Sequence, residues 1–192
     1  MSTETQTIQG RADVMDALIG AATTLFAEQG IAGTSVRSIA AAAGVNHGLL
    51  HRHFGSKEGL LRAVMRRLQN EVTASMPPER PDETITDVLY AAVGPSQQLH
   101  SRIVARAMLE GRDPLELQED FPVVKRLLKA SMRSSGTLTP EARVALILST
   151  SLGLLTFQNY LREAIGQDEL EWTSTCAELM RYATANTKEK PA

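Results

Sequence analysis

Residues 25–61 read LFAEQGIAGTSVRSIAAAAGVNHGLLHRHFGSKEGLL, and this stretch decides the fold. Two short segments, residues 36–43 and 47–54, flank a turn at Gly44. Ala40 is small enough to let two helices cross closely, Gly44 can adopt the positive φ of a sharp turn, and Leu50 can be buried between the helices. The spacing predicts a helix-turn-helix, a motif whose second helix enters the major groove of DNA.

Charge along the chain supports this interpretation. No acidic residue lies between Glu28 and Glu58, whereas Arg37, Arg52, Lys57 and three of the four histidines do. Residues 1–67 carry seven Lys or Arg against five Asp or Glu, and residues 68–192 carry thirteen against seventeen. A mildly basic N-terminal segment joined to an acidic C-terminal region favours specific binding of duplex DNA over non-specific binding along it. The alternative is a constitutive or architectural DNA-binding protein without an effector.

The remaining sequence predicts an all-α protein. Aromatic content is 4%, Ala, Leu and Arg are common, and strand alternation and hairpin signals are absent. We expect a helix-turn-helix domain with a flexible N-terminal tail over residues 1–55, and an effector-binding and dimerisation domain over residues 56–192, with the fourth helix as connector. Nine helices are predicted, over residues 13–28, 36–43, 47–54, 56–72 and beyond, 82–93, 96–110, 115–132, 139–164 and 168–185.

Capping residues mark several of these boundaries. Gly30 is expected to end the first helix, and Thr34 or Ser35 to cap the second. Asn46 and Ser56 are expected to cap the third and fourth. Pro122 is expected to kink the seventh helix.

Polar and basic residues at the outward positions of the motif are the candidate DNA contacts. Arg37 can reach a guanine edge with two hydrogen bonds, and Leu49 can contact a thymine methyl group. Thr34, His51 and Lys57 are expected to bind phosphates, which positions the protein without reading sequence. The full predicted DNA-binding set is Thr34, Ser35, Arg37, Asn46, His47, Gly48, Leu49, His51, Arg52 and Lys57.

The motif resembles the TetR family of bacterial transcriptional regulators. The matching residues are Phe26 to Gly30, Thr34 to Val36, Ile39-Ala40, Ala43 to Val45, Gly48, His53-Phe54, Ser56 to Glu58 and Leu60-Leu61. The family usually has Tyr, which commonly binds a phosphate, at the position of His51, and more often Thr or Ala at that of Leu49. The resemblance implies three N-terminal helices for DNA and a larger C-terminal domain for ligand binding and dimerisation. A palindromic operator and release by a small-molecule effector follow as expectations.

Two sets of C-terminal residues are candidates for these roles. His100, Arg102 and Arg106 lie on successive turns of one helix, with Glu110 one turn beyond. They form either a solvated face with i, i+4 pairing or the border of an effector cavity, for which His100 and Arg106 are the candidates. Gln158 and Asn159 interrupt the apolar eighth helix and are also candidate effector contacts. That helix is apolar almost all round, which predicts burial against a second copy of the chain. The predicted dimer interface comprises Leu148, Leu152, Leu155, Trp172, Leu179 and Met180.

Other classes of protein have less support. No cofactor or metal is predicted: His47 and His51 are spaced i, i+4, but no carboxylate or cysteine lies nearby. No pair of carboxylates, activated nucleophile or phosphate-binding glycine loop indicates an enzyme. Residues 144–161 are long enough to span a membrane but contain several polar side chains, so no membrane partner is expected. The lone Cys176 and the absence of signal-peptide features at the N-terminus predict a cytoplasmic protein.

Overall fold

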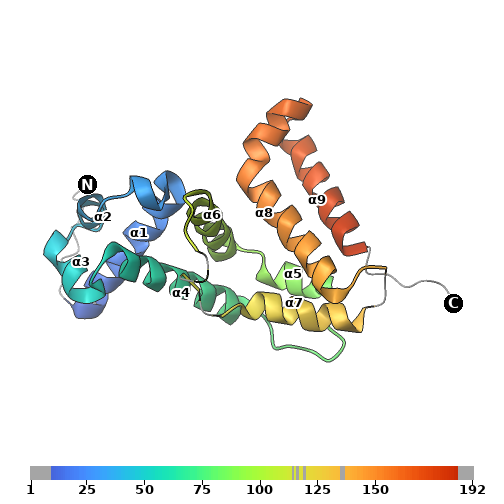
Figure 1. Ribbon diagram of the computed structural model, residues 1–192, viewed down its shortest axis with the longest axis horizontal. Helices are drawn as coiled ribbons and strands as arrows, with labels where there is room; N and C mark the ends of the chain where they lie inside the picture. The colour runs from blue at the N-terminus through green and yellow to red at the C-terminus, as the bar shows by residue number, and fades with distance from the viewer. Residues whose placement is uncertain (1–9, 114, 116, 119, 135–136, 186–192) are drawn as a thin grey trace, which may run out of the picture. The chain divides into compact units, whose positions relative to one another are not determined.

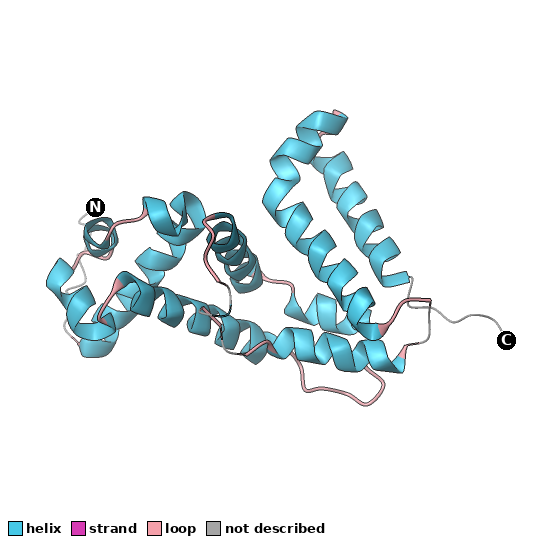
Figure 2. Ribbon diagram, in the orientation of Figure 1, coloured by secondary structure: helices cyan, strands magenta, loops and turns pink. Residues whose placement is uncertain are grey.

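The computed structural model describes residues 10–113, 115, 117–118, 120–134 and 137–185. Within these residues the fold is all-α, as predicted, with nine α-helices and no strand (Figures 1 and 2). The helices are α1 (Arg11–Gly33), α2 (Val36–Ala42), α3 (His47–Phe54), α4 (Lys57–Ser75), α5 (Ile85–Ala92), α6 (Pro95–Leu109), α7 (Pro122–Arg133), α8 (Pro140–Ile165) and α9 (Glu169–Ala185).

The chain divides into two compact units. The first comprises residues 1–69 and 106–119, and the second comprises residues 70–105 and 120–192. Both α4 and α6 therefore contribute residues to each unit. The domain boundary predicted at residue 55 lies inside the first unit, because the N-terminal part of α4 belongs to it.

The first unit is built around α1, α2 and α3, which pack against one another. Its interior is made of fully buried aliphatic and aromatic side chains, among them Leu18, Phe26, Ile39, Leu50 and Leu61. At about 25 cal/mol per Å² of apolar surface, burying each of these side chains contributes roughly 1.5–3 kcal/mol to stability. This core fixes the short helices α2 and α3, which are too short to be stable alone.

Gly30 interrupts α1 without ending it. Its φ of 79° and ψ of 170° are not helical, and the chain resumes a helical turn from Ile31 to Gly33. Thr34 then leaves the helix with extended backbone. The prediction that α1 stops at residue 28 was therefore wrong by about one turn, although Gly30 does break the helix. Only glycine adopts this φ without steric cost.

The second unit is a stack in which α5 packs on α7, α7 on α8, and α8 on α9. Its core contains Ile85, Val88, Leu127, Val144 and Ile147, all buried. Each of these residues comes from an apolar stripe of its own helix. Long-range packing of these stripes, rather than any single motif, holds the unit together.

Two predicted helices begin later than expected. The helix expected at residue 82 begins at Ile85, because the hydroxyl of Thr84 accepts a hydrogen bond from the Asp87 amide at 3.2 Å and caps it there. The helix expected over residues 115–132 begins at Pro122 instead of bending there. Proline lacks an N–H and has a helical φ, so the first position of a helix suits it better than the interior.

Charged residues join the segments of the second unit. Glu83 and Arg126 form a salt bridge in which both side chains are largely buried. The guanidinium of the buried Arg143 donates to the carbonyl oxygens of Ser131 at 2.8 Å and Leu138 at 2.9 Å. These bonds satisfy carbonyl groups at the end of α7 and before α8, which would otherwise be unpaired in the interior.

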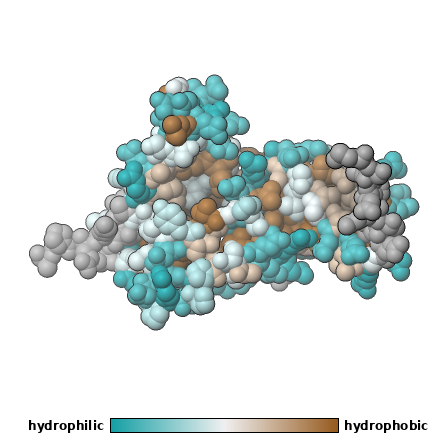
Figure 3. Space-filling view, turned by 180° about the vertical axis from the view of Figure 1, so that it is seen from behind, coloured by the Kyte–Doolittle hydropathy of each residue, from teal (hydrophilic) through white to brown (hydrophobic). Residues whose placement is uncertain are grey.

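The eighth helix keeps much of its apolar surface uncovered within one chain. By length and composition α8 could cross a membrane, and only 11% of its most apolar 18-residue window is buried. Its buried residues are Arg143, Val144 and Ile147, all in its N-terminal half. Phe157 and Tyr160 are exposed, as is Leu179 on α9. Figure 3 shows apolar surface lying among the hydrophilic residues of the molecule.

Candidate DNA-binding surface

The turn between α2 and α3 is held by caps at both helix starts. Ser35 and Ser38 form a reciprocal capping box, in which each side chain pairs with the other's backbone amide at 3.0 Å. The side-chain oxygen of Asn46 accepts from the Gly48 amide at 2.9 Å and starts α3. Gly44 has a φ of 66° in the turn between them. The predicted bounds of α3 are therefore confirmed, and Ser35 rather than Thr34 caps α2.

The N-terminal half of α3 presents polar groups to solvent. His47, Gly48, His51 and Arg52 are exposed and Leu49 is half-buried, whereas Leu50 is fully buried against the other helices. A Cβ at Gly48 would lie 3.3 Å from the side-chain oxygen of Asn46 and crowd the capping bond. The outward side of α3 is therefore free for contact with a partner and its inward side is not.

Arg37 lies in the first turn of α2 and is exposed. Its guanidinium forms no hydrogen bond or ion pair within the described part of the chain, so all five of its donors are available. A guanidinium with this freedom can form two parallel hydrogen bonds to the O6 and N7 atoms of guanine.

Thr34 and Lys57 have structural partners that the sequence did not predict. The buried hydroxyl of Thr34 donates to the carbonyl oxygen of Gly30 at 2.6 Å. The ammonium of Lys57 donates to the carbonyl oxygens of Ile31 at 2.8 Å and Thr34 at 3.0 Å. Both side chains thus hold the connection between α1 and α2, and the phosphate contacts expected of them stay predictions.

Two residues at the C-terminal end of α6, one inside the helix and one just after it, support the same connection. Glu110, just after α6, accepts hydrogen bonds from the amides of Ile31 at 2.8 Å and Ala32 at 3.0 Å. Arg106 donates to the carbonyl oxygens of Ala27 at 3.0 Å and Glu28 at 2.9 Å. This pair therefore satisfies the backbone groups that the break at Gly30 leaves unpaired. Sequence reasoning missed Glu110 because nearly eighty residues separate it from its partners.

The carboxylates of Glu58 and Glu110, close to the α1–α2 connection and the start of α4, both lie near Arg112. Arg112 lies 3.8 Å from Glu58 and 3.7 Å from Glu110. The pKa of Glu58 is lowered, chiefly by a hydrogen bond from its own backbone amide and also by the Ser56 hydroxyl and the charge of Arg112. The Glu58 carboxylate is therefore paired with Arg112, and no acid lies between residues 28 and 58 to compensate the cationic groups of α2 and α3.

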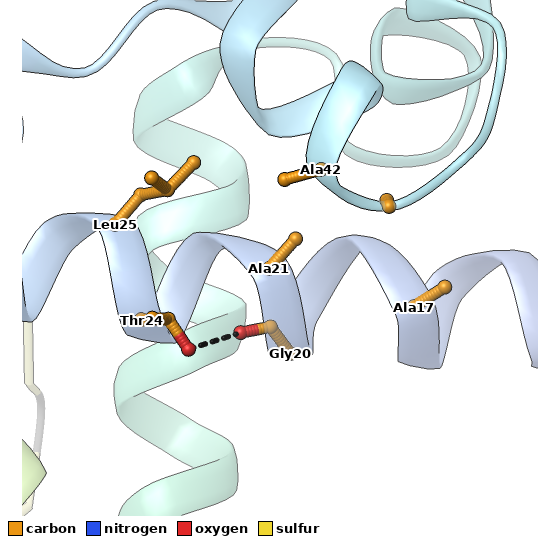
Figure 4. Close-up of a pocket in the computed structure, with 7 residues that line it drawn as sticks. Ala17, Gly20, Ala21, Thr24, Leu25 and Ala42 are labelled. Carbon is orange, nitrogen blue, oxygen red and sulfur yellow. Dashed lines mark hydrogen bonds between the residues drawn. The ribbon is translucent and has the colours of Figure 1, made fainter.

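The described residues hold no cluster of metal-ligating side chains, and the three histidines of the motif do not converge. A groove does lie between α1 and α2, lined by Ala17, Gly20, Ala21, Thr24, Leu25, Ala42 and Ala43. Figure 4 shows that the small side chains of α1 face Ala42 across it. The Thr24 hydroxyl is bonded to the Gly20 carbonyl at 3.4 Å, so the groove presents few groups that could orient a ligand.

The residues predicted to bind an effector do not form one cluster. Arg106 belongs to the first unit and its guanidinium is engaged with α1, as described above. His100 on α6 and Gln158 on α8 are half-buried, and Asn159 is exposed. The effector role of these four residues stays a prediction.

The residues predicted at the dimer interface differ in exposure. Trp172 is buried within its own chain. Leu148 and Met180 pack partly against the core of the second unit. Leu152 and Leu155 are half-buried, and Leu179 is exposed. The physical reason for placing Trp172 between subunits is thereby removed, whereas Leu152, Leu155 and Leu179 retain surface that a partner can cover.

Together, the capped α2–α3 turn, the exposed polar side of α3 and the absence of acidic residues between Glu28 and Glu58 define a DNA-binding protein of the helix-turn-helix class. The family described as bacterial regulatory proteins, tetR family, matches residues 18–64. The HTH-type transcriptional repressor Rv3405c of Mycobacterium tuberculosis is 41% identical over 162 residues, which cover 84% of this chain and 82% of that protein. The chain belongs to the TetR family of bacterial transcriptional regulators, and it is not an enzyme.

One further relative and one solved structure are also similar to this chain. The HTH-type transcriptional repressor KstR2 of Rhodococcus jostii is 49% identical over 49 residues, covering 26% of this chain and 24% of that protein. The crystal structure of a transcriptional regulator from Rhodococcus has a TM-score of 0.67 and is 20% identical, covering 92% of this chain and 99% of that one. The latter similarity confirms the fold over both units.

Proposed function

We propose that the protein is a homodimeric repressor that binds a palindromic operator and leaves it when a small-molecule effector binds. The observation that carries the proposal is the surface of α2 and α3. There Arg37, His47 and Arg52 are exposed on helices whose ends are capped and whose inner faces are buried. The similar proteins Rv3405c and KstR2 are HTH-type transcriptional repressors, which supports repression as the outcome of binding.

The uncovered apolar surface of α8 supports the dimer. Leu148, Leu152 and Leu155 follow one another at helical spacing, and Phe157 lies just beyond with 52% of its surface exposed. Polar residues such as Ser149 and Asn159 lie among the apolar residues of α8, which favours a subunit contact over a lipid bilayer. A two-fold dimer places two copies of α3 about one turn of DNA apart, roughly 34 Å, and so requires a palindrome.

The effector is assigned to the second unit because its helices combine apolar surface with half-buried polar side chains. Burial of a polar group is costly unless it is paired, so Gln158 and its neighbours are suited to line a cavity with a ligand. An uncharged or weakly polar organic molecule fits such a lining. It lowers operator affinity only if it binds the DNA-free conformation more tightly, and a coupling of about 1–3 kcal/mol is typical. Such a regulator works in the cytoplasm.

Selection from a library of random DNA duplexes tests the proposal. We expect the enriched sequences to be palindromes with half-sites about one helical turn apart, and the free protein to sediment as a dimer at micromolar concentration. Fluorescence anisotropy of the selected duplex is then recorded against a panel of metabolites. Enrichment of no sequence contradicts specific recognition. If a palindrome is enriched but no compound releases the protein, it is a constitutive DNA binder.

A further inference from the structure

His51 and Gly55 are joined by two hydrogen bonds that close a ring at the end of α3. The backbone amide of Gly55 donates to the carbonyl oxygen of His51 at 3.0 Å. In the other direction, Nδ1 of His51 lies 3.1 Å from the carbonyl oxygen of Gly55. The imidazole is therefore held against the backbone that ends the helix, although the residue itself is exposed.

This geometry determines which ring nitrogen carries the proton. A carbonyl oxygen only accepts hydrogen bonds, so Nδ1 must be the donor in this pair. In the neutral imidazole the other nitrogen, Nε2, then carries no hydrogen and can only accept. Nε2 has no partner in the described part of the chain and therefore faces a ligand or water.

A phosphate oxygen also only accepts hydrogen bonds. Neutral His51 held by Gly55 would therefore present a lone pair to the DNA backbone and could not bind it directly. The imidazolium, in contrast, keeps the bond to Gly55 through Nδ1–H and offers a second donor, Nε2–H, together with a positive charge. Only the protonated side chain suits both partners at once.

The charged surroundings of His51 do not supply a competing partner. The charged and titratable groups on α3 and on the elements around it are His47, Arg52 and His53 on α3, Arg37 on α2, Arg11, Asp13, Asp16 and Glu28 on α1, and Lys57 and Glu58 at the start of α4. None of these side chains forms a hydrogen bond or ion pair with His51 in the described residues. Asp16 pairs with Arg67 and Glu58 with Arg112 instead.

We propose that binding of DNA phosphate takes up a proton at His51, so that each protomer binds DNA more tightly as the pH falls. This inference rests on the proposed DNA-binding role of α3. The proton binds to Nε2, which then donates a hydrogen bond to the phosphate. When the DNA dissociates, the proton is released to solvent. The contact is independent of base sequence, so operator and random DNA share it.

Anisotropy titrations of the full-length protein with a random-sequence duplex, at constant ionic strength from about pH 6 to about pH 8, test this inference. For each proton that binding takes up, the affinity falls by at most about tenfold per unit rise in pH, in the upper part of this range. Wild-type protein is expected to show this dependence. His51→Gln, whose amide can donate at every pH, is expected to remove most of it. His47→Gln, one turn earlier, and His100→Gln, in the second unit, are the matched controls and are expected to retain it.

The possible outcomes distinguish failure of proton uptake at His51 from failure of DNA binding itself. DNA binding that is independent of pH in the wild type, or a pH dependence that survives in His51→Gln, overturns the inference and leaves DNA binding intact. Loss of the dependence in His47→Gln instead assigns the proton to His47 and overturns it equally. Absence of DNA binding at every pH overturns the proposed function as well. Nitrogen-15 NMR of the free protein at about pH 8 gives a readout without DNA: we expect the Nδ1–H tautomer at His51, and a predominant Nε2–H tautomer contradicts the inference.

Discussion

The carboxylate of Glu110 lies 2.8 Å from the backbone amide of Ile31, and it caps the helical turn that resumes after the break in α1. Arg106, one turn earlier on α6, binds the carbonyl groups of the helix before the break. The C-terminal end of α6 and the residue that follows it thus satisfy both ends of the interruption at Gly30. Since Thr34 and Lys57 bond to the same segment, the start of α2 depends on contacts far away in the sequence.

Glu110→Ala is expected to destabilise the first unit. Its removal leaves the amides of Ile31 and Ala32 without their partner, and loss of a charged hydrogen-bond acceptor of this kind costs about 1–3 kcal/mol. Urea unfolding followed by circular dichroism measures the effect. Glu163→Ala, an exposed acid near the end of α8, is the control and should change the unfolding free energy little. Equal stability of the two variants would show that water replaces the Glu110 carboxylate at no cost.

Gly59→Ala is expected to be more damaging than a glycine-to-alanine change in an exposed helix. A Cβ at Gly59 would overlap the carbonyl oxygen of Phe54, so the junction of α3 and α4 would have to move. Gly20 in α1 has no atom within 4 Å of the equivalent position, and alanine there should be neutral or stabilise by up to about 1 kcal/mol. Melting temperatures of the two variants test the contrast. A Gly59→Ala protein as stable as Gly20→Ala would refute the steric argument.

Arg37→Ala is expected to weaken operator binding by about 1–3 kcal/mol and to relax preference at one base pair of each half-site. The reason is that the free guanidinium on α2 is suited to read a guanine edge. Binding of the variant to a set of operators with single base changes measures the specificity. Arg181→Ala on α9 serves as the control for loss of one positive charge. If Arg37→Ala loses the same affinity on every sequence, Arg37 contacts phosphate instead of a base.

Leu155→Glu is expected to dissociate the dimer while leaving each chain folded. Leu155 lies on the half-buried part of α8, outside the core of the second unit, so a charge there affects the proposed subunit contact first. Sedimentation velocity at micromolar concentration gives the oligomeric state, and circular dichroism checks folding. Tyr90→Glu on α5, which is 77% exposed, is the control. A Leu155→Glu protein that remains dimeric would move the interface elsewhere.

Acid is expected to destabilise the protein through its capping carboxylates. The pKa of Asp87 is lowered by hydrogen bonds from the amide and hydroxyl of Thr84, and that of Glu58 is lowered chiefly by its own amide. A carboxyl whose folded pKa lies below its unfolded pKa stabilises the fold above the unfolded value, and this stabilisation disappears as the pH falls through the folded value. Urea unfolding from neutral pH down to about pH 3 should show this loss. Asp87→Asn should reduce the slope of the unfolding free energy against pH. An unchanged slope would exclude Asp87 as a source of the pH-dependent stability.

The sequence by itself determined the helix-turn-helix and most helix boundaries, because the signals are local. A side-chain cap acts within three residues, as at Asn46 and Thr139, and a turn glycine acts at its own backbone. The exposed side of α3 also follows from local periodicity, since burial of Leu50 leaves His47 and His51 outside.

Tertiary structure alone decided which polar side chains remain available. The sequence predicted that Thr34 and Lys57 bind phosphate and that Arg106 binds an effector. In the structure, each of these side chains bonds to backbone groups around the break in α1. Similarly, Trp172 is buried within its own chain. These contacts join residues that are remote in sequence, and a local pattern carries no information about where the unpaired carbonyl and amide groups of another helix will lie. Whether a hydrogen-bonding group faces DNA or the protein's own backbone is therefore settled only when the helices pack.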